Sequence, residues 1–145
     1  MSKRLVLDAN ILIRAVLGTH ASRLIEEYAR STSFFTVDEA FEDAAKYVPS
    51  IITKFGGNEE AVSVALGKLE RLERFIQVFP VENLVAYEAE ARERLKRRDE
   101  EDWLYVALAD LLGCPIWTED TDFFGTGVAV WTSDNVELFL KRPSS

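Results

Sequence analysis

The sequence predicts an α/β fold in which a parallel sheet of about five strands is flanked by helices in three layers. Three observations lead to this prediction. Short apolar runs alternate with helical stretches along the chain. The length of 145 residues is typical of one domain with a sizeable core. Apolar residues make up 48% of the chain, which argues against disorder. We therefore expect a single domain over residues 1–145.

The first elements are read from hydrophobic spacing and from glycine. The apolar run at residues 3–7 predicts the first strand. A short helix at 10–17 follows it and ends at Gly18, a residue typical of helix ends. Apolar residues then recur at helical spacing over 21–28, and a second short strand is expected at 33–35.

A helical hairpin is expected next. Thr36 and Glu39 have the spacing of a capping box, in which each side chain accepts a hydrogen bond from a backbone amide at the start of a helix. Pro49 is expected to kink this helix or to start a new turn. The pair Gly56-Gly57 ends the stretch, and Asn58 caps the following helix.

Strands and helices continue to alternate in the second half of the chain. Three further strands are expected, at residues 75–79, 115–118 and 128–131. Helices are expected at 84–95, at 103–112 and after an N-cap at Ser133. This order predicts a parallel sheet, and sites in such sheets lie at the carboxyl ends of the strands.

Composition limits the class of protein. The net charge of -8 counts against a nucleic-acid binder with a broad basic face, but it fits a carboxylate site that a metal neutralises. Cys114 is the single cysteine, so it forms no internal disulfide, and a reducing cytoplasm fits best. The opening residues look like a signal peptide until Asp8 interrupts the apolar run, and no stretch is long enough to span a membrane.

Two aspartates occupy matching places, each at the end of a predicted buried strand. Asp8 ends the apolar run at residues 5–7, and Asp120 lies just past the run at 115–118. Both carboxylates are therefore expected at the edge of the sheet where ligands bind. Asp8 is explained equally well as the N-cap of the helix that follows it.

Two more acids are candidates on predicted helices. Asp102 lies close to the apolar face of its helix, so its carboxylate must be paired, capped or bound to a metal. The alternative is that Asp99 and Asp102 form a capping box. Glu42 lies one turn beyond Glu39, and taken alone it is better explained as a solvated surface residue.

The segment at residues 118–123, Thr-Glu-Asp-Thr-Asp-Phe, is the most specific in the chain. An Asp-rich turn is the alternative explanation. Thr118 at the strand end and Phe123 after Asp122 indicate a loop held in place, and such loops often carry function. Four converging carboxylates would repel one another unless a cation lay between them. Oxygen ligands without a Cys/His set favour Mg²⁺ or Mn²⁺ over zinc.

Together these segments resemble the PIN-domain nucleases, especially the small bacterial members similar to VapC-type ribonuclease toxins. The resemblance covers essentially the whole chain and depends on four segments in order, which are residues 8–10, Glu42, the stretch from Asp102 to Ala109, and residues 118–123. It implies a quartet of catalytic, metal-binding acids, with Asp122 as a further metal ligand and two supporting residues, Asn10 and Thr118. The quartet is Asp8, Glu42, Asp102 and Asp120. Glu39 is the alternative to Glu42, and as a ligand it would have to abandon its capping role.

The resemblance implies a Mg²⁺- or Mn²⁺-dependent endoribonuclease that is the toxin of a toxin–antitoxin pair. The expected partners are an RNA substrate, a cognate antitoxin and a second copy of the chain. We expect Arg14 and Arg98 to contact RNA phosphates at the rim of the site. Two alternatives stay open, a nuclease of the same fold that processes RNA and is not a toxin, and a catalytically silent module that binds RNA or protein.

Overall fold

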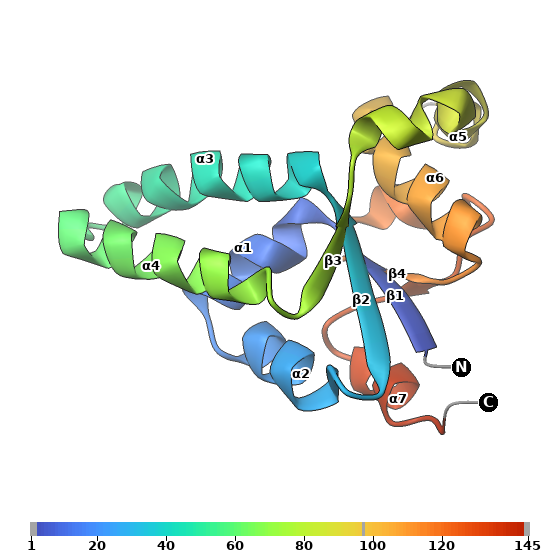
Figure 1. The fold of residues 1–145 in the computed structure, drawn as a ribbon. Helices are drawn as coiled ribbons and strands as arrows, with labels where there is room; N and C mark the ends of the chain where they lie inside the picture. Colours follow the sequence, from blue (N-terminus) through green and yellow to red (C-terminus); the bar gives the residue numbers. More distant parts are fainter. Residues whose placement is uncertain (1–2, 97, 144–145) are drawn as a thin grey trace.

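Five strands form a single parallel sheet in the order β3-β2-β1-β4-β5, as predicted. The computed structural model describes residues 3–96 and 98–143 (Figure 1). The strands are β1 (Lys3–Leu7), β2 (Thr32–Val37), β3 (Ile76–Phe79), β4 (Ile116–Trp117) and β5 (Val130–Trp131). The chain moves outward from β1 to β3 and then returns to the other side of β1 for β4. The strand order therefore reverses between β1 and β4, which is where open α/β sheets form ligand sites.

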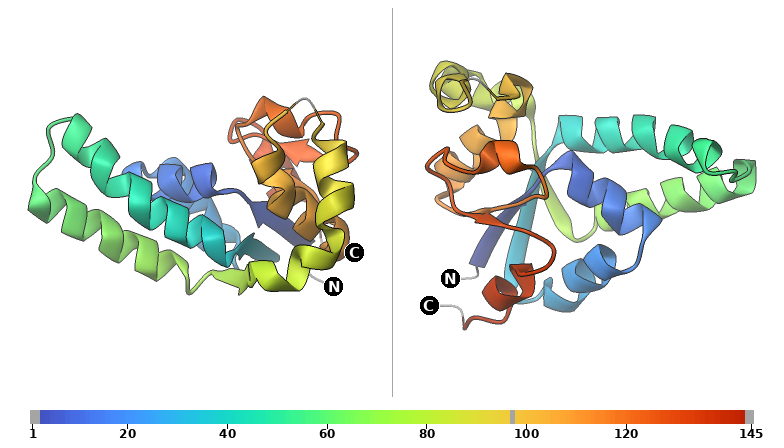
Figure 2. Two further views of the ribbon diagram at one scale, coloured as in Figure 1. Left: turned by 90° about the horizontal axis from the view of Figure 1, so that it is seen from above. Right: turned by 180° about the vertical axis from the view of Figure 1, so that it is seen from behind.

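Helices cover both faces of the sheet. Helices α1, α3 and α4 pack together on one side, whereas α5 and α6 pack on the other (Figure 2). Helices α3 and α4 form a long antiparallel pair that extends away from the sheet (Figures 1 and 2). The α-helices are α1 (Ala9–Leu17), α2 (His20–Tyr28), α3 (Asp38–Lys54), α4 (Glu59–Leu72), α5 (Glu88–Arg94), α6 (Trp103–Leu112) and α7 (Val136–Leu140). Short 3₁₀ turns are η1 (Val81–Tyr87), η2 (Glu100–Asp102) and η3 (Thr121–Phe123).

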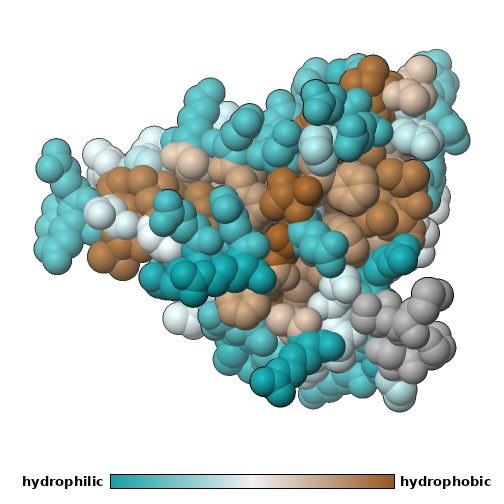
Figure 3. Space-filling model, viewed as in Figure 1, coloured by the Kyte–Doolittle hydropathy of each residue, from teal (hydrophilic) through white to brown (hydrophobic). Residues whose placement is uncertain are grey.

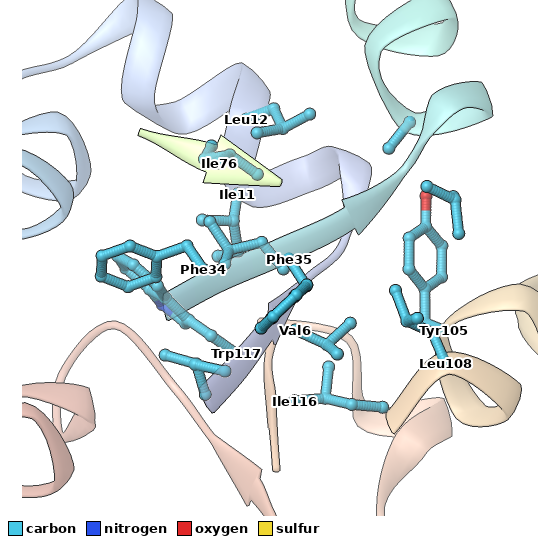
Figure 4. Packing of buried hydrophobic residues seen from close by; sticks show 14 of the residues in the cluster. Val6, Ile11, Leu12, Phe34, Phe35, Ile76, Tyr105, Leu108, Ile116 and Trp117 are labelled. Carbon is cyan, nitrogen blue, oxygen red and sulfur yellow. The ribbon is translucent and has the colours of Figure 1, made fainter. Parts of the chain in front are cut away.

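The core lies on both sides of β1. Leu5, Val6 and Leu7 are fully buried, because helices cover both faces of this central strand. Helix α6 is buried from Trp103 to Ala109 and packs against β1 and β2. Figure 4 shows side chains of these elements meeting in one cluster. The apolar run of β1 and the almost wholly apolar α6 thus fix the backbone at Asp8 and at Asp102. No helix within residues 3–96 and 98–143 is long and apolar enough to cross a membrane.

The predicted capping box at Thr36 and Glu39 does not form. Strand β2 continues to Val37, and the Thr36 hydroxyl donates a hydrogen bond to the Leu7 carbonyl at 2.7 Å. Helix α3 therefore begins at Asp38 without a side-chain cap on its N-cap residue. Asp38 instead accepts hydrogen bonds from the amides of Glu39 and Val81, at 2.8 and 3.1 Å. The Glu39 carboxylate is consequently left without the capping role that the sequence assigned to it.

The structure narrows one further local prediction and corrects another. Pro49 lies inside α3, which continues as one helix to Lys54, so of the two predicted effects of this proline a new start is excluded. Asn135 occupies the N-cap position of α7 in place of Ser133. Ser133 has another role, because its hydroxyl accepts a hydrogen bond from Trp117 Nε1 at 3.1 Å and its amide donates to Glu119 at 2.5 Å. Ser133, in the segment after β5, thus contacts both the end of β4 and the loop that follows β4.

Candidate metal centre

Asp8 lies directly after β1 and caps the N-terminus of α1. One carboxylate oxygen accepts a hydrogen bond from the Ile11 amide at 3.1 Å, as an N-cap does. The other accepts a hydrogen bond from the Thr118 hydroxyl. The residue is 3% exposed. Because a carboxylate oxygen has two acceptor positions, the capping role leaves Asp8 able to bind a cation as well.

Thr118 joins the acids at the ends of β1 and β4. Its hydroxyl donates to Asp8 and accepts a hydrogen bond from the Asp120 amide at 2.9 Å. Asp120 in turn accepts a hydrogen bond from the Asp122 amide at 2.9 Å. Phe123, which follows, is fully buried. The loop after β4 is therefore held at both ends, and its backbone directs two carboxylates toward the edge of the sheet.

Three carboxylates near the ends of the strands lie close enough to share one ion. Oxygens of Asp102, Asp120 and Asp122 all lie within 4.8 Å of one another. Asp102 is the last residue of η2 and immediately precedes the buried helix α6. The Asp99 amide donates to Asp122 at 3.3 Å, which ties η2 to the loop after β4. Segments far apart in the sequence thus meet at one cluster.

An acidic cavity of about 330 Å³ opens beside this cluster. Its wall includes six carboxylate side chains and, among the described residues that line it, no lysine or arginine. The acids are Asp8, Glu39, Asp43, Asp99, Glu101 and Asp102. Carboxylates at this density need a neutralising charge, and an all-oxygen set of this kind suits a hard divalent cation such as Mg²⁺ or Mn²⁺. The side chains present therefore fit the metal that the sequence led us to expect.

The structure brings most of the predicted site residues together. Asp8, Asn10 and Asp102 line the cavity, and Asp120 and Asp122 adjoin it through their cluster with Asp102. Thr118 links the two parts, as described above.

Glu42 is placed differently from the other predicted acids. It does not line the cavity, whereas Glu39 and Asp43 of the same helix do. These two residues are four apart, so they lie on one face of α3. The spacing of four residues is visible in the sequence, but Glu39 is assigned there to a capping box with Thr36, so the pair is not recognised as part of the site.

The two predicted rim arginines lie on different sides of the site. Arg14 is exposed and lines a neighbouring hollow with His20, and this hollow shares Ile13 with the acidic cavity. Arg98 donates to the Arg94 carbonyl at 3.1 Å. Its guanidinium lies beside Gly125, in the loop after Asp122, where a Cβ added to the glycine would come within 3.1 Å of it.

Burial and mutual repulsion raise the pKa values of the central acids. Burial raises the pKa of Asp8 to about 6, although hydrogen bonds from Thr118 and Ile11 oppose the rise. Burial, with the charges of Asp99 and Asp120, raises the pKa of Asp102 to about 8. The pKa of Glu39 is also raised, by burial and then by Asp43. A cation bound among these groups would favour their charged forms.

The metal-free protein should lose stability as the pH rises from about 4 to about 8. Asp8 and Asp102 hold their protons in the folded state to about pH 6 and about pH 8, well above their ordinary pKa of 3.8. Their stabilising contribution is complete below the ordinary pKa and is lost as the pH passes the raised values. Melting temperatures measured in EDTA across this range should fall, and saturating Mn²⁺ should flatten the trend. A melting temperature that climbs steadily in EDTA would contradict these assignments.

Comparison with known proteins agrees with the fold. The sequence matches a family described as PIN domain over residues 6–141. No curated protein matches it. Solved structures with a similar fold at low sequence identity include the three described next. VapBC2 from Rickettsia felis, bound to a promoter DNA fragment, has a TM-score of 0.67 at 13% identity, over 89% of this chain and 98% of that one.

Two further similar structures come from different organisms. PAE2754 from Pyrobaculum aerophilum has a TM-score of 0.69 at 15% identity, over 97% of this chain and 98% of that one. A toxin–antitoxin complex from Klebsiella pneumoniae has a TM-score of 0.53 at 20% identity, over 89% and 97%. At these identities the likeness is one of fold, and it agrees with the three-layer architecture described above.

Proposed function

The chain belongs to the PIN-domain family, whose members are nucleases, and from that premise we propose that it is a metal-dependent endoribonuclease that hydrolyses RNA phosphodiesters. The observation that supports this most strongly is the convergence of carboxylates at the point where the strand order reverses. A phosphodiester is an anion, so it can approach these groups only if cations lie between them. The proposal thus explains why the cavity wall combines so many acids with no basic side chain among its described residues.

We assign the metal ligands from the geometry. Asp102, Asp120 and Asp122 hold one Mg²⁺ or Mn²⁺ ion, because their oxygens already lie within 4.8 Å of one another. Asp8 faces the same cavity and completes the site together with the acids that α3 supplies. A bound ion would activate water for attack and stabilise charge on the phosphate and the leaving oxygen.

The other residues of the site position these ligands. Thr118 fixes Asp8 relative to Asp120, since its single hydroxyl bonds to both residues. Asn10 is the second residue of α1, is exposed and lines the cavity, so its amide is available to contact the substrate. Arg14, in the adjoining hollow, remains a candidate for contact with RNA phosphates. Arg98, beside the loop after Asp122, is a second candidate.

Purified protein should cleave single-stranded RNA when Mn²⁺ or Mg²⁺ is supplied and should stop when EDTA is added. Asp120→Asn should lower the rate by at least about 100-fold, because it removes charge from the shared ion site. Gel analysis of labelled RNA measures both effects. Failure to cleave any RNA with either ion would favour the binding-module alternative.

We also propose that the protein is a toxin with a protein antitoxin. Two of the similar structures are toxin–antitoxin proteins, VapBC2 and the Klebsiella pneumoniae complex, and this supports the proposal. Expression should then arrest growth, Asp120→Asn should relieve the arrest, and an adjacent gene should encode an inhibitor. Cleavage of RNA without growth arrest would instead indicate an enzyme of RNA processing.

A homodimer remains part of the proposal. The α3–α4 pair carries exposed apolar side chains near its free end, including Phe55, which is 82% exposed, and Val64, which is 59% exposed. Figure 3 shows apolar residues gathered toward this end of the molecule. Such side chains are typical of an interface with another protein chain. Sedimentation or light scattering of the purified protein measures the oligomeric state directly.

A further inference from the structure

Tyr105 is a buried tyrosine on the acidic cavity for which the proposed mechanism has so far no role. It lies on α6, three residues after Asp102, and lines the cavity while being only 5% exposed. Its ring packs edge-on against Phe123, with the centroids 6.1 Å apart. Figure 4 shows the hydroxyl at the end of the ring that points away from α6. The ring is thus fixed by packing, and its polar end reaches the acids.

The hydroxyl of Tyr105 lies beside a backbone amide. The Ala9 amide is close enough to oppose the rise in the pKa of this hydroxyl. Ala9 is the first residue of α1, so this amide has no partner within its own helix. An amide can only donate, so this neighbour leaves the hydroxyl proton of Tyr105 to be donated elsewhere. Burial and then the charge of Asp8 raise the pKa of Tyr105 far above its ordinary value, so the group keeps its proton at any physiological pH.

Donors are scarce on the wall of this cavity. Among the described residues that line it, the side chains that can donate a hydrogen bond belong to Asn10, Tyr47 and Tyr105. Asn10 is exposed, and Tyr47 is 48% exposed, so water solvates both. A phosphodiester offers only acceptor oxygens to its surroundings. Tyr105 is therefore the one donor of the three that is both buried and held in place.

We propose that the Tyr105 hydroxyl donates a hydrogen bond to a non-bridging oxygen of the scissile phosphate and is a catalytic residue of this enzyme. The inference rests on the ribonuclease function proposed above. A donor that is already oriented stabilises the charge that builds on phosphate oxygens without having to reorganise during the reaction.

Tyr105→Phe removes the hydroxyl and keeps the ring that packs on Phe123. We expect kcat to fall about 100-fold while KM stays within about twofold, since the lost bond acts mainly in the transition state. The increase in melting temperature that Mn²⁺ produces should stay as in wild type, because the carboxylates remain. Tyr28→Phe is the matched control. It removes a hydroxyl that donates to Glu137 at 2.9 Å and does not line the cavity, so it should leave kcat unchanged.

A purely structural role for Tyr105 predicts a different result. If the hydroxyl served only to hold the ring in the core beside the Ala9 amide, Tyr105→Phe would lower the melting temperature and leave kcat unchanged at temperatures where the variant is folded. Should the variant not fold, 3-fluorotyrosine at position 105 keeps the hydroxyl and nearly the same volume. Its more acidic phenol is a stronger donor, so an altered kcat would support the proposal and an unchanged kcat would overturn it.

Phosphorothioate RNA, with sulfur in place of one non-bridging oxygen, tests the contact itself. Sulfur accepts hydrogen bonds poorly, so one of the two diastereomers should slow wild type in Mn²⁺ and slow Tyr105→Phe much less. Equal slowing of both proteins by both diastereomers would overturn the assignment of Tyr105 while leaving the ribonuclease function in place. Absence of RNA cleavage by wild type would overturn both.

Discussion

Asp8→Asn should abolish metal-dependent RNA cleavage and at the same time make the metal-free protein more stable. Asp8 is 3% exposed, and its pKa is raised to about 6 by burial. At about pH 8 the folded protein must therefore keep a buried carboxylate charged, at a cost of up to about 3 kcal/mol. The amide of asparagine is neutral and can still accept the hydrogen bond from Ile11 that caps α1. The substitution thus removes the unfavourable charge and retains the cap.

The stability of the metal-free variant and its metal-dependent properties should change in opposite directions. We expect the melting temperature in EDTA to rise above that of wild type, whereas activity falls at least about 100-fold and the stabilisation by Mn²⁺ shrinks. Asp134→Asn makes the same change of charge at an exposed position and should alter none of these three quantities. A purely structural Asp8 would give the reverse pattern, with lower stability in EDTA and normal cleavage. Full activity of Asp8→Asn would remove this residue from the site.

The position of Asp8 and Asp120 could be predicted from the sequence because strand ends are marked by composition. The apolar run at residues 5–7 and the run before Thr118 each indicated a buried strand, and parallel strands end at one edge of a sheet. The pairing of β1 with β4 was not encoded in any local pattern. It follows from the global strand order, which places the two ends side by side.

The contributions of α3 could not be predicted because a local signal competed with the tertiary pairing of strands. Thr36 and Glu39 matched a capping box, yet β2 extends to Val37, and the Thr36 hydroxyl bonds to Leu7 on the neighbouring strand. Tertiary pairing of the strands therefore overrides the local preference for a cap. Helix α3 begins at Asp38, and its acids Glu39 and Asp43 line the cavity.

Tyr105 and Asp99 illustrate a second limit of the sequence. A tyrosine within an apolar helix gives the same helical spacing as any core residue, so its hydroxyl carried no functional signal. Asp99 was explained as part of a capping box with Asp102. In the structure it accepts a hydrogen bond from the Glu101 amide and also donates its own amide to Asp122. The contact with Glu101 is local and caps η2, whereas the contact with Asp122 depends on the loop after β4, which is distant in sequence.

Glu39→Gln and Asp43→Asn should each impair cleavage, whereas Glu42→Gln should leave it nearly unchanged. Glu39 and Asp43 line the acidic cavity, and Glu42 is exposed outside its wall. Asp43 also lies close enough to Tyr105 for its charge to raise the pKa of the phenol. We expect each of the first two substitutions to reduce kcat/KM by about 10- to 100-fold, because each removes a charge that faces the bound ions. The double variant should lose more than either alone if one acid partly replaces the other.

All three substitutions remove a charge from the same helix, so they serve as controls for one another. If only the net charge of α3 mattered, all three substitutions would change RNA cleavage equally, because each makes the surface less acidic and so more attractive to RNA. A site-specific role separates them, and titration of Mn²⁺ against the melting temperature gives a second reading that needs no substrate. If Glu42→Gln abolished both activity and the Mn²⁺ response while the other two kept them, Glu42 would be the ligand and α3 would have to rotate to bring it inward. Preserved differences in the expected order would identify the face of α3 that binds the metal.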